Sequence, residues 1–383
     1  MRILHITGGL GNLSGTTHIL GALSEEQAKA GHQVSAWFCE RPNEEPVVPN
    51  PSLVTTRCFP LTLPFANPGV SFPFGRAIQE GVRGFDVIHI HAVWNFPTIT
   101  TMRAAHRAGV PYVVAPQGSL DPWALSFHKW RKSLYTRYVE KPYFDRAAAI
   151  QALTAKEADQ VRAFGVPARI AIIPNGIRFA EFDREADVAG FRAKHGLGER
   201  KFVLYLSRLH PKKGLDLLAQ SFASVIKHHP DLVLVIAGGD YGTGFEAAVR
   251  GFVKAAHIED KTIFAGAVRG DEKRAAFKAA ELFVLPSRSE GLPMAALEAM
   301  ASGTPVVVSE HCNVPEVAEA RAGIVISLDV DDLARGISRL LSDEQERKDC
   351  ARAARDLAAR KFEWSAIAEQ TLKLYAELTS QRP

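Results

Sequence analysis

Short apolar runs recur along the chain, and stretches with helical spacing separate them. In the first half these runs cover residues 2–7, 33–38, 86–91, 111–116, 148–153 and 169–174. Most are apolar at successive positions, which is typical of strands buried on both faces of a parallel sheet. The segments between them predict helices, for example 20–32, where Gly31 is placed to end the helix. Alternating strands and helices predict an open parallel sheet covered by helices.

The same pattern begins again in the second half. A charged stretch with weak β propensity follows residue 174, and further apolar runs then cover 201–209, 232–239, 262–266, 282–287, 305–310 and 323–327. The fold class is therefore α/β, with two Rossmann-like doubly wound domains at 1–173 and 201–362, joined by a linker at 174–200. Residues 363–381 predict a closing amphipathic helix. Ligands of such sheets bind beyond the carboxyl ends of the strands, so the expected site is a cleft between the domains.

Composition and charge exclude several classes of protein. Forty-six basic residues against 42 acidic ones give a net charge of +4, too small to predict a nucleic-acid partner. The four cysteines are far apart and form no CxxC pair, so structural zinc and a disulfide framework are not expected. The first residues are too weakly apolar for a signal peptide, and no apolar run approaches the ~18 residues of a membrane span. We expect a cytoplasmic protein, either free or lying against the inner face of the membrane.

A glycine cluster at residues 8–15 follows the first strand and opens a helix. Such a loop offers backbone N–H groups and a helix N-terminus to an anion. Gly9 and Gly11 fit a dinucleotide fingerprint, but its third position is Ser14. Glu40, after the second strand, fits the ribose-binding acid of a dehydrogenase, so that rival stays open, as does a plain turn without a ligand.

The segment 207–214, SRLHPKKG, leaves the first strand of the second domain. Arg208 and Lys213 are placed to converge on one diphosphate, because arginine supplies a planar fork and lysine a compact charge. By spacing alone a solvated loop explains them equally well. Their position at the sheet edge favours the diphosphate.

Residues 286–307, PSRSEGLPMAALEAMASGTPVV, hold two glutamates eight positions apart. We expect the backbone N–H groups of Gly291 and Leu292, at the start of a helix, to face sugar or phosphate oxygens. Glu290 in the loop then has its carboxylate at the mouth of the site and holds the transferred sugar, while Glu298, two helical turns on, holds a ribose. The alternative for Glu298 is a plain position on the polar face of the helix.

Taken together, these segments resemble the retaining sugar-nucleotide glycosyltransferases of family 4, also called group 1, which have the GT-B fold. The likeness covers the whole chain: the early glycine loop, PNGI before the linker, the Arg/Lys pair, E-x7-E, and VPEV near residue 315. It implies that the last helix crosses back to the first domain. It also implies roles for these donor-side residues: Arg208 and Lys213 at the diphosphate, Glu290 at the sugar, Glu298 at the ribose, Val268 in the segment 264–270 at the base, and Gly9 or Gly11 near the phosphate.

The chain departs from the family pattern on the acceptor side. Many relatives carry a histidine after the strand that corresponds to PYVVA, whereas this chain has Gln117. His91, at the end of an earlier strand, is our substitute candidate, with a structural hydrogen-bonding role as the alternative. The stretches HIHAVWNFPT and DPWAL resemble a sub-group associated with bacterial O-antigen, lipopolysaccharide or exopolysaccharide assembly.

The resulting hypothesis is transfer of a hexose from a UDP- or GDP-sugar to a saccharide or lipid-linked saccharide, with retention and by front-face attack. We expect no cofactor and no metal, since no DxD-like cluster is present. The basic and aromatic segment 127–144 predicts contact with an anionic membrane or a lipid-linked pyrophosphate, or else a solvated helix face. A nucleotide-sugar epimerase and a non-catalytic sugar-nucleotide binding protein remain as alternatives. A NAD-dependent dehydrogenase is weaker, because it leaves the basic pair and the glutamates without a role.

Overall fold

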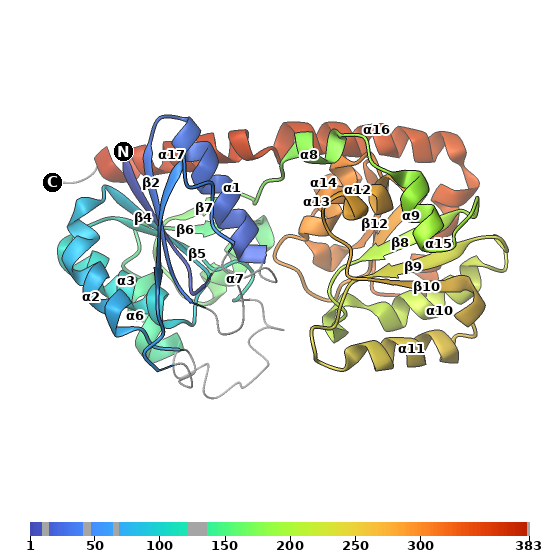
Figure 1. Ribbon diagram of the computed structural model, residues 1–383, viewed down its shortest axis with the longest axis horizontal. Helices are drawn as coiled ribbons and strands as arrows, with labels where there is room; N and C mark the ends of the chain where they lie inside the picture. The colour runs from blue at the N-terminus through green and yellow to red at the C-terminus, as the bar shows by residue number, and fades with distance from the viewer. Residues whose placement is uncertain (10–14, 41–46, 64–68, 121–135, 381–383) are drawn as a thin grey trace. The chain divides into compact units, whose positions relative to one another are not determined.

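The computed structural model describes residues 1–9, 15–40, 47–63, 69–120 and 136–380, which form two compact units (Figure 1). The first unit combines Met1–Gly176 with Trp364–Pro383, and the second unit is Ile177–Glu363. Each unit is built on one sheet in which all paired strands are parallel. The predicted fold class is confirmed.

The sheet of the first unit has seven strands in the order β3-β2-β1-β4-β5-β6-β7. Its strands are β1 (Arg2–Ile6), β2 (Gln33–Cys39), β3 (Val54–Phe59), β4 (Val87–His91), β5 (Tyr112–Ala115), β6 (Ala149–Ala152) and β7 (Ile170–Ile172). Its helices are α1 (Gly15–Lys29), α2 (Phe72–Gly81), η1 (Val82–Gly84), α3 (Phe96–Ala108), η2 (Thr136–Glu140, a π-helix), α6 (Lys141–Phe144), α7 (Ala155–Ala163) and α17 (Trp364–Ser380).

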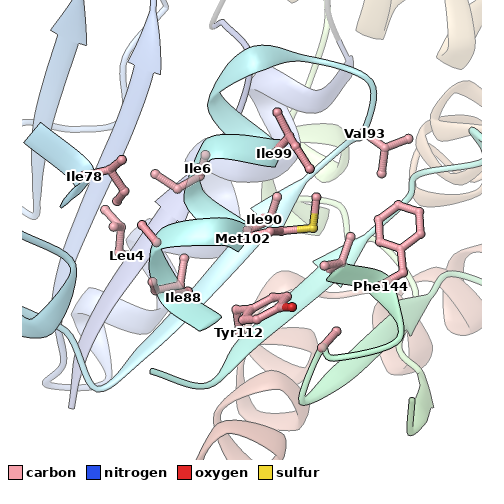
Figure 2. Packing of buried hydrophobic residues seen from close by; sticks show 14 of the residues in the cluster. Leu4, Ile6, Ile78, Ile88, Ile90, Val93, Ile99, Met102, Tyr112 and Phe144 are labelled. Carbon is pink, nitrogen blue, oxygen red and sulfur yellow. The ribbon is translucent and has the colours of Figure 1, made fainter. Parts of the chain in front are cut away.

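Two apolar layers cover the faces of this sheet, because successive strand residues point to opposite sides. One layer contains Ile88 and Ile90 of β4 packed with Met102 of α3, as Figure 2 shows. The other layer combines residues on the opposite face of the strands, such as Ile3, Val34 and Val87, with side chains of α1 and α17.

The C-terminal helix α17 belongs to the first unit although it follows the second unit in sequence. Its buried residues recur at helical spacing: Trp364, Ile367, Ala368, Thr371, Leu374, Tyr375 and Leu378. This stripe packs on α1 and on the face of the first sheet that carries Ile3 and Val87. The predicted return of the last helix to the first domain is therefore confirmed.

Strand β3 is the element of the first sheet that the apolar pattern missed. It forms the edge of the sheet and pairs only with β2 among the described strands. Thr55, Arg57 and Cys58 are exposed, and only its two end residues, Val54 and Phe59, are buried. An edge strand needs fewer apolar residues than a central one, so its sequence resembles a loop.

The sheet of the second unit has six strands in the order β10-β9-β8-β11-β12-β13, which is the Rossmann arrangement. Its strands are β8 (Phe202–Leu206), β9 (Val233–Ala237), β10 (Thr262–Gly266), β11 (Leu282–Leu285), β12 (Val306–Ser309) and β13 (Gly323–Ile326). Its helices are α8 (Phe179–Asp183), α9 (Val188–Lys194), η3 (Pro211–Lys213), α10 (Leu215–Val225), α11 (Phe245–Ala255), η4 (Glu259–Lys261), α12 (Gly270–Ala279), α13 (Met294–Ala301), η5 (Glu310–Cys312), α14 (Glu316–Glu319), α15 (Val330–Ser342) and α16 (Glu344–Lys361).

The segment 174–200, which the sequence predicts as a linker, is mostly part of the second unit in the structure. From Ile177 onward it is part of the second unit and carries the helices α8 and α9. Phe182 and Phe191 are buried there. The Phe182 ring packs edge-on against Phe277, and the Phe191 ring packs at a tilt against Phe202. Each of these short helices is held mainly by one buried phenylalanine. The residues between the two phenylalanines are largely charged, so the sequence shows no apolar pattern there. Among the described helices, none is both long enough and apolar enough to cross a membrane.

Candidate functional site

Lys213 and Glu290 form a buried ion pair beyond the carboxyl ends of β8 and β11. Lys213 Nζ donates to Glu290 Oε1 at 2.5 Å, and Ser287 Oγ donates to the same oxygen at 2.7 Å. Lys212 Nζ lies 3.8 Å from Glu290 Oε2. Both side chains of the pair are at least nine-tenths buried. The structure thus brings together two of the predicted catalytic residues from loops 77 positions apart.

The carboxylate of Glu290 is held ionised within this site. Burial is the largest single influence and opposes ionisation, but the positive charges of Lys213 and Lys212 and the hydrogen bonds from Lys213 and Ser287 together lower its pKa. The expected placement of this carboxylate at the mouth of the site is not what the structure shows. Its side chain is 8% exposed and pairs with Lys213 and Lys212.

Backbone contacts fix the loop that carries Glu290. Glu290 N donates to His311 O at 3.0 Å, and the side-chain amide of Asn313 donates to Glu290 O. Asn313 is buried, has φ +58°, and its Oδ1 has no hydrogen-bond partner within the described structure. The loop after β12, next to the VPEV motif, therefore supports the loop after β11.

Arg288 joins the Glu290 loop to the Lys213 turn. Its guanidinium donates to both carboxylate oxygens of Asp216, at 2.8 and 2.6 Å, and to Pro211 O at 3.1 Å. Its backbone N donates to Lys212 O at 2.6 Å. Sequence reasoning missed this positioning residue, although its place two residues before Glu290 in PSRSEG was a usable signal.

Gly214 makes the close approach of these two loops possible. It has φ +71°, and a Cβ added there would lie 2.0 Å from Pro286 O. Gly196 has a similar φ of +60° but open space around the same position. Of these two glycines, only Gly214 has backbone in the place that a side chain would occupy.

Gly214→Ala is therefore expected to destabilise the second unit by about 3 kcal/mol or more, because backbone strain and steric overlap add. Gly196→Ala, the matched control, is expected to cost only about 1 kcal/mol. Calorimetric unfolding of both variants measures the difference. Equal losses of stability would show that the contact with Pro286 does not constrain the turn.

Arg208 follows β8 and is exposed, so its guanidinium is open to a ligand. Tyr205 Oη donates to the backbone oxygen of Arg208 at 3.0 Å and fixes the start of this loop. His210, four residues before Gly214, has a lowered pKa, first because of burial and then because of the charges of Arg208, Lys212 and Lys213. These three cations thus act on one small region, as a diphosphate site requires.

Glu298 lies on α13 and pairs with α12. Lys273 Nζ donates to Glu298 Oε1 at 2.7 Å and lies 5.3 Å from the centroid of the Phe182 ring. No described contact joins Glu298 to Lys213 or Glu290. The structure therefore places the two glutamates of the motif with different lysine partners.

The remaining donor-side residues lie at the same edge of the second sheet. Gly291 and the nearly buried Leu292 lead into α13, and Pro293 occupies the N-cap of that helix. Among the described residues, no side chain caps this helix end, so no cap takes up its first N–H groups. Val268 follows β10 and is buried, which leaves its backbone as the group able to contact a base.

The predicted site residues of the first unit have different environments. Gly9 is buried after β1, whereas Gly11 lies outside the described residues, as does the first half of the basic segment 127–144. Gln117, after β5, has φ +56° and exchanges hydrogen bonds with Asn175, whose Nδ2 donates to Gln117 Oε1 at 2.9 Å. His91 is not presented to a ligand: it is 1% exposed and faces the interior.

His91 belongs to a buried network whose proton positions follow from one another. Thr371 Oγ1 donates to Ala368 O, so it accepts from Gln27 Nε2 at 3.0 Å. Gln27 Oε1 then accepts from His5 Nε2 at 2.8 Å. The other ring nitrogen of His5 is therefore bare and accepts from His91 Nε2 at 2.9 Å. This series of hydrogen bonds leaves His91 Nδ1 without a proton, and Nδ1 has no hydrogen-bond partner in the described structure.

His89 completes the cluster with Tyr375 of α17, 2.6 Å from its Nδ1. The ring nitrogens of His5, His89 and His91 come within 4.8 Å of one another, which is the spacing of a metal site. The rings of His89 and His91 are stacked, however, with centroids 4.2 Å apart, so their in-plane lone pairs do not converge. Both nitrogens of His5 are already engaged. We assign these histidines to the docking of α17 rather than to a metal.

Glu140 is a buried residue that sequence reasoning missed. Its Oε1 accepts from the backbone N of Trp94 at 2.7 Å, and its Oε2 has no hydrogen-bond partner within the described structure. Burial raises its pKa to about 7, against a smaller opposing effect of the Trp94 hydrogen bond. Ala92 and Trp94 have φ of +65° and +62°, so Glu140 supports a strained loop after β4.

Both the fold and this site define a two-domain Rossmann-like protein of the GT-B class. One solved structure with this fold is the sucrose-phosphate synthase from Thermosynechococcus elongatus, with a TM-score of 0.79 and 22% identity over 100% of both chains. Another is HepE from Anabaena in complex with UDP and glucose, with a TM-score of 0.78 and 17% identity over 98% of this chain and 100% of that chain.

Two family models match successive parts of the chain. The model described as "Glycosyl transferase 4-like domain" matches residues 14–176, and "Glycosyl transferases group 1" matches residues 187–357. The chain belongs to this glycosyltransferase family.

Curated relatives agree with this assignment. The GDP-mannose-dependent alpha-(1-6)-phosphatidylinositol monomannoside mannosyltransferase of Mycolicibacterium smegmatis is 31% identical over 53% of this chain and 55% of its own length. The chain spans about half the length of the first curated relatives that it matches.

Proposed function

We propose that this protein transfers a hexose from a nucleoside diphosphate sugar to a hydroxyl of a saccharide or lipid-linked saccharide, with retention at the anomeric carbon. The observation that carries the proposal is the buried Lys213–Glu290 pair, with the exposed Arg208 close by, at the carboxyl edge of the second sheet. Three cations around His210 match the charge of a diphosphate.

The leaving group explains why the cations gather at this edge. As the sugar–phosphate bond breaks, negative charge grows on the diphosphate, and Arg208, Lys212 and Lys213 stabilise it. The acceptor hydroxyl attacks from the face that the diphosphate leaves, and its proton passes to the departing phosphate oxygen. The same cations supply the charge that a metal would otherwise bring, so we expect transfer to continue in EDTA.

Glu290 is better suited to binding than to nucleophilic attack. Its Oε1 accepts from Lys213 and Ser287, Oε2 faces Lys212, and its lowered pKa makes it a weak base. A double displacement needs a free carboxylate beside the anomeric carbon. Front-face attack, with Glu290 accepting from the sugar hydroxyls, fits this environment.

The relatives support a nucleoside diphosphate sugar as donor, but they do not distinguish uracil from guanine as its base. The Mycolicibacterium relative is named for GDP-mannose, and the HepE structure holds UDP and glucose. We therefore propose a UDP- or GDP-hexose as donor. A role in bacterial cell-surface polysaccharide assembly, at the cytoplasmic face of the membrane, follows from the sequence resemblance and extends the same proposal.

A thermal-shift panel of UDP, GDP and NAD tests the donor assignment. A nucleotide at 100 times its Kd stabilises the folded protein by about 2.7 kcal/mol, so binding should raise the melting temperature clearly. We expect UDP or GDP to do this and NAD to have no effect. Stabilisation by NAD alone would contradict the proposal, and conversion of the sugar nucleotide without an acceptor, followed by NMR, would indicate an epimerase.

A further inference from the structure

An exposed tyrosine lies at the carboxyl edge of the second sheet, in the loop after β9. Tyr241 is 46% exposed, although large apolar side chains of this unit are mostly buried. Its φ is +51°, which is uncommon for a residue with a side chain. The chain thus places an aromatic ring in solvent at a constrained position.

Asp240 builds the turn that holds this ring. Its Oδ1 accepts from Gly242 N at 3.1 Å, its Oδ2 accepts from Glu246 N at 3.4 Å, and its backbone O accepts from Thr243 N at 3.2 Å. The position of Tyr241 is therefore set before any ligand arrives.

The ring lies close to the loops after two neighbouring strands. A Cβ built on Gly239 would be 3.7 Å from Tyr241 Cε1 and 3.9 Å from the Cβ of Ala267. Gly239 O accepts from Leu209 N at 3.0 Å, which joins this loop to the residue after Arg208. Tyr241 is thus near both the Arg208 loop and the residue that precedes Val268.

Strand order gives the direction of a bound donor. Along the sheet edge Glu290 follows β11, Arg208 follows β8, Tyr241 follows β9, and Ala267 follows β10, and these four strands are consecutive neighbours. A nucleoside diphosphate sugar has its sugar and base on opposite sides of the diphosphate. With the sugar at Glu290 and the diphosphate at Arg208, the base extends toward β9 and β10.

The position of Glu298 agrees with this direction. Its partner Lys273 lies on α12, the helix that follows β10. A ribose held by Glu298 is therefore on the β10 side of the site, next to a base near Ala267.

We propose that Tyr241 is the stacking platform for the nucleobase of the donor. The inference rests on the proposed function, whose donor it places on the sheet edge. An aromatic ring stacks on any base, so Tyr241 contributes affinity for the nucleoside, while the neighbouring backbone is left to read the identity of the base.

Calorimetric titration with three probes tests the inference: UDP, GDP and inorganic pyrophosphate, which has no base. Stacking on a base is worth about fivefold to a hundredfold in affinity. Tyr241→Ala is expected to weaken binding of the nucleoside diphosphate by about tenfold or more and to leave pyrophosphate binding unchanged. Tyr241→Phe, which keeps the ring, should bind within about twofold of the wild type. Phe72→Ala, an exposed aromatic of the first unit, is the matched control.

Two results would overturn the inference and leave the proposed function standing. One is unchanged binding of UDP and GDP by Tyr241→Ala. The other is an equal loss for pyrophosphate, which would show that the variant disturbs the loop rather than the base. A wild-type protein that binds neither UDP nor GDP would instead overturn the proposed function itself, and the inference with it.

Discussion

Lys213→Met is expected to lower the turnover of sugar transfer by about 10²- to 10³-fold, because the buried ammonium stabilises charge on the leaving diphosphate. Lys213 is almost fully buried and 2.5 Å from Glu290, so no water replaces it easily. The matched control is Lys227→Met, an exposed lysine just after α10, which should keep wild-type turnover. Release of nucleoside diphosphate in steady state measures both.

The same change also removes one partner of a buried ion pair, so stability needs a separate control. Removing the closer cation leaves Glu290 with Ser287 and the more distant Lys212, which is expected to cost about 3 kcal/mol. The double variant Lys213→Met, Glu290→Gln should recover much of that stability, because no buried charge remains, yet stay inactive. Near-normal turnover in the single variant, or recovered turnover in the double variant, would contradict the proposed mechanism.

Acid is expected to destabilise the first unit steeply below about pH 6.5. Burial lowers the pKa of His5 to about 4 and the pKa values of His89 and His91 well below their usual range. An unfolded chain binds protons at these histidines near pH 6.5, while the folded unit does not. The stability they contribute is complete above pH 6.5 and is lost as pH falls toward the folded pKa values.

Glu140 acts in the opposite direction within the same unit. Its folded pKa of about 7 lies above its unfolded value of 4.5, so between these values the folded state binds one extra proton. Three histidines against one carboxyl leave a net difference of two protons. The expected slope between pH 6 and pH 5 is about 3 kcal/mol per pH unit.

Tryptophan fluorescence offers a selective readout of this slope. The five tryptophans are at positions 37, 94, 123, 130 and 364, all within the first unit. In denaturant unfolding at pH 7.5, 6.5 and 5.5, the denaturant concentration at the midpoint should decrease as the pH is lowered. Glu140→Gln should steepen the fall, His89→Gln should flatten it, and His228→Gln, in the second unit, should leave it unchanged. A constant midpoint in the wild type would refute the role assigned to the histidines.

The apolar pattern by itself determined the architecture. Twelve apolar runs predicted twelve of the thirteen strands in the described part of the chain, because a strand covered on both faces must be apolar at nearly every position. The amphipathic spacing of 363–378 likewise predicted α17. The pattern failed at β3, which has an exposed edge, and at α8 and α9, each held mainly by one phenylalanine.

The grouping of site residues in the second unit could also be predicted from the sequence. The loops that follow parallel strands lie at one edge of the sheet, whatever the details of packing. This is why Arg208, Lys213 and Glu290 could be placed near one another from their positions after β8 and β11. The partners of those residues could not be read in this way. That Lys273 pairs with Glu298 and that Arg288 joins two loops depend on which rotamers and helix packings close the structure.

Tertiary structure alone decided the role of the first-unit polar residues. His91 looked like a group exposed at a strand end, yet it is buried in a neutral network that also contains Thr371 and Tyr375 of the distant helix α17. Glu140 gave no local signal, since its raised pKa arises from packing around a π-helix. Local sequence fixes backbone pattern and loop position, whereas burial and charge state depend on segments that only the folded chain brings together.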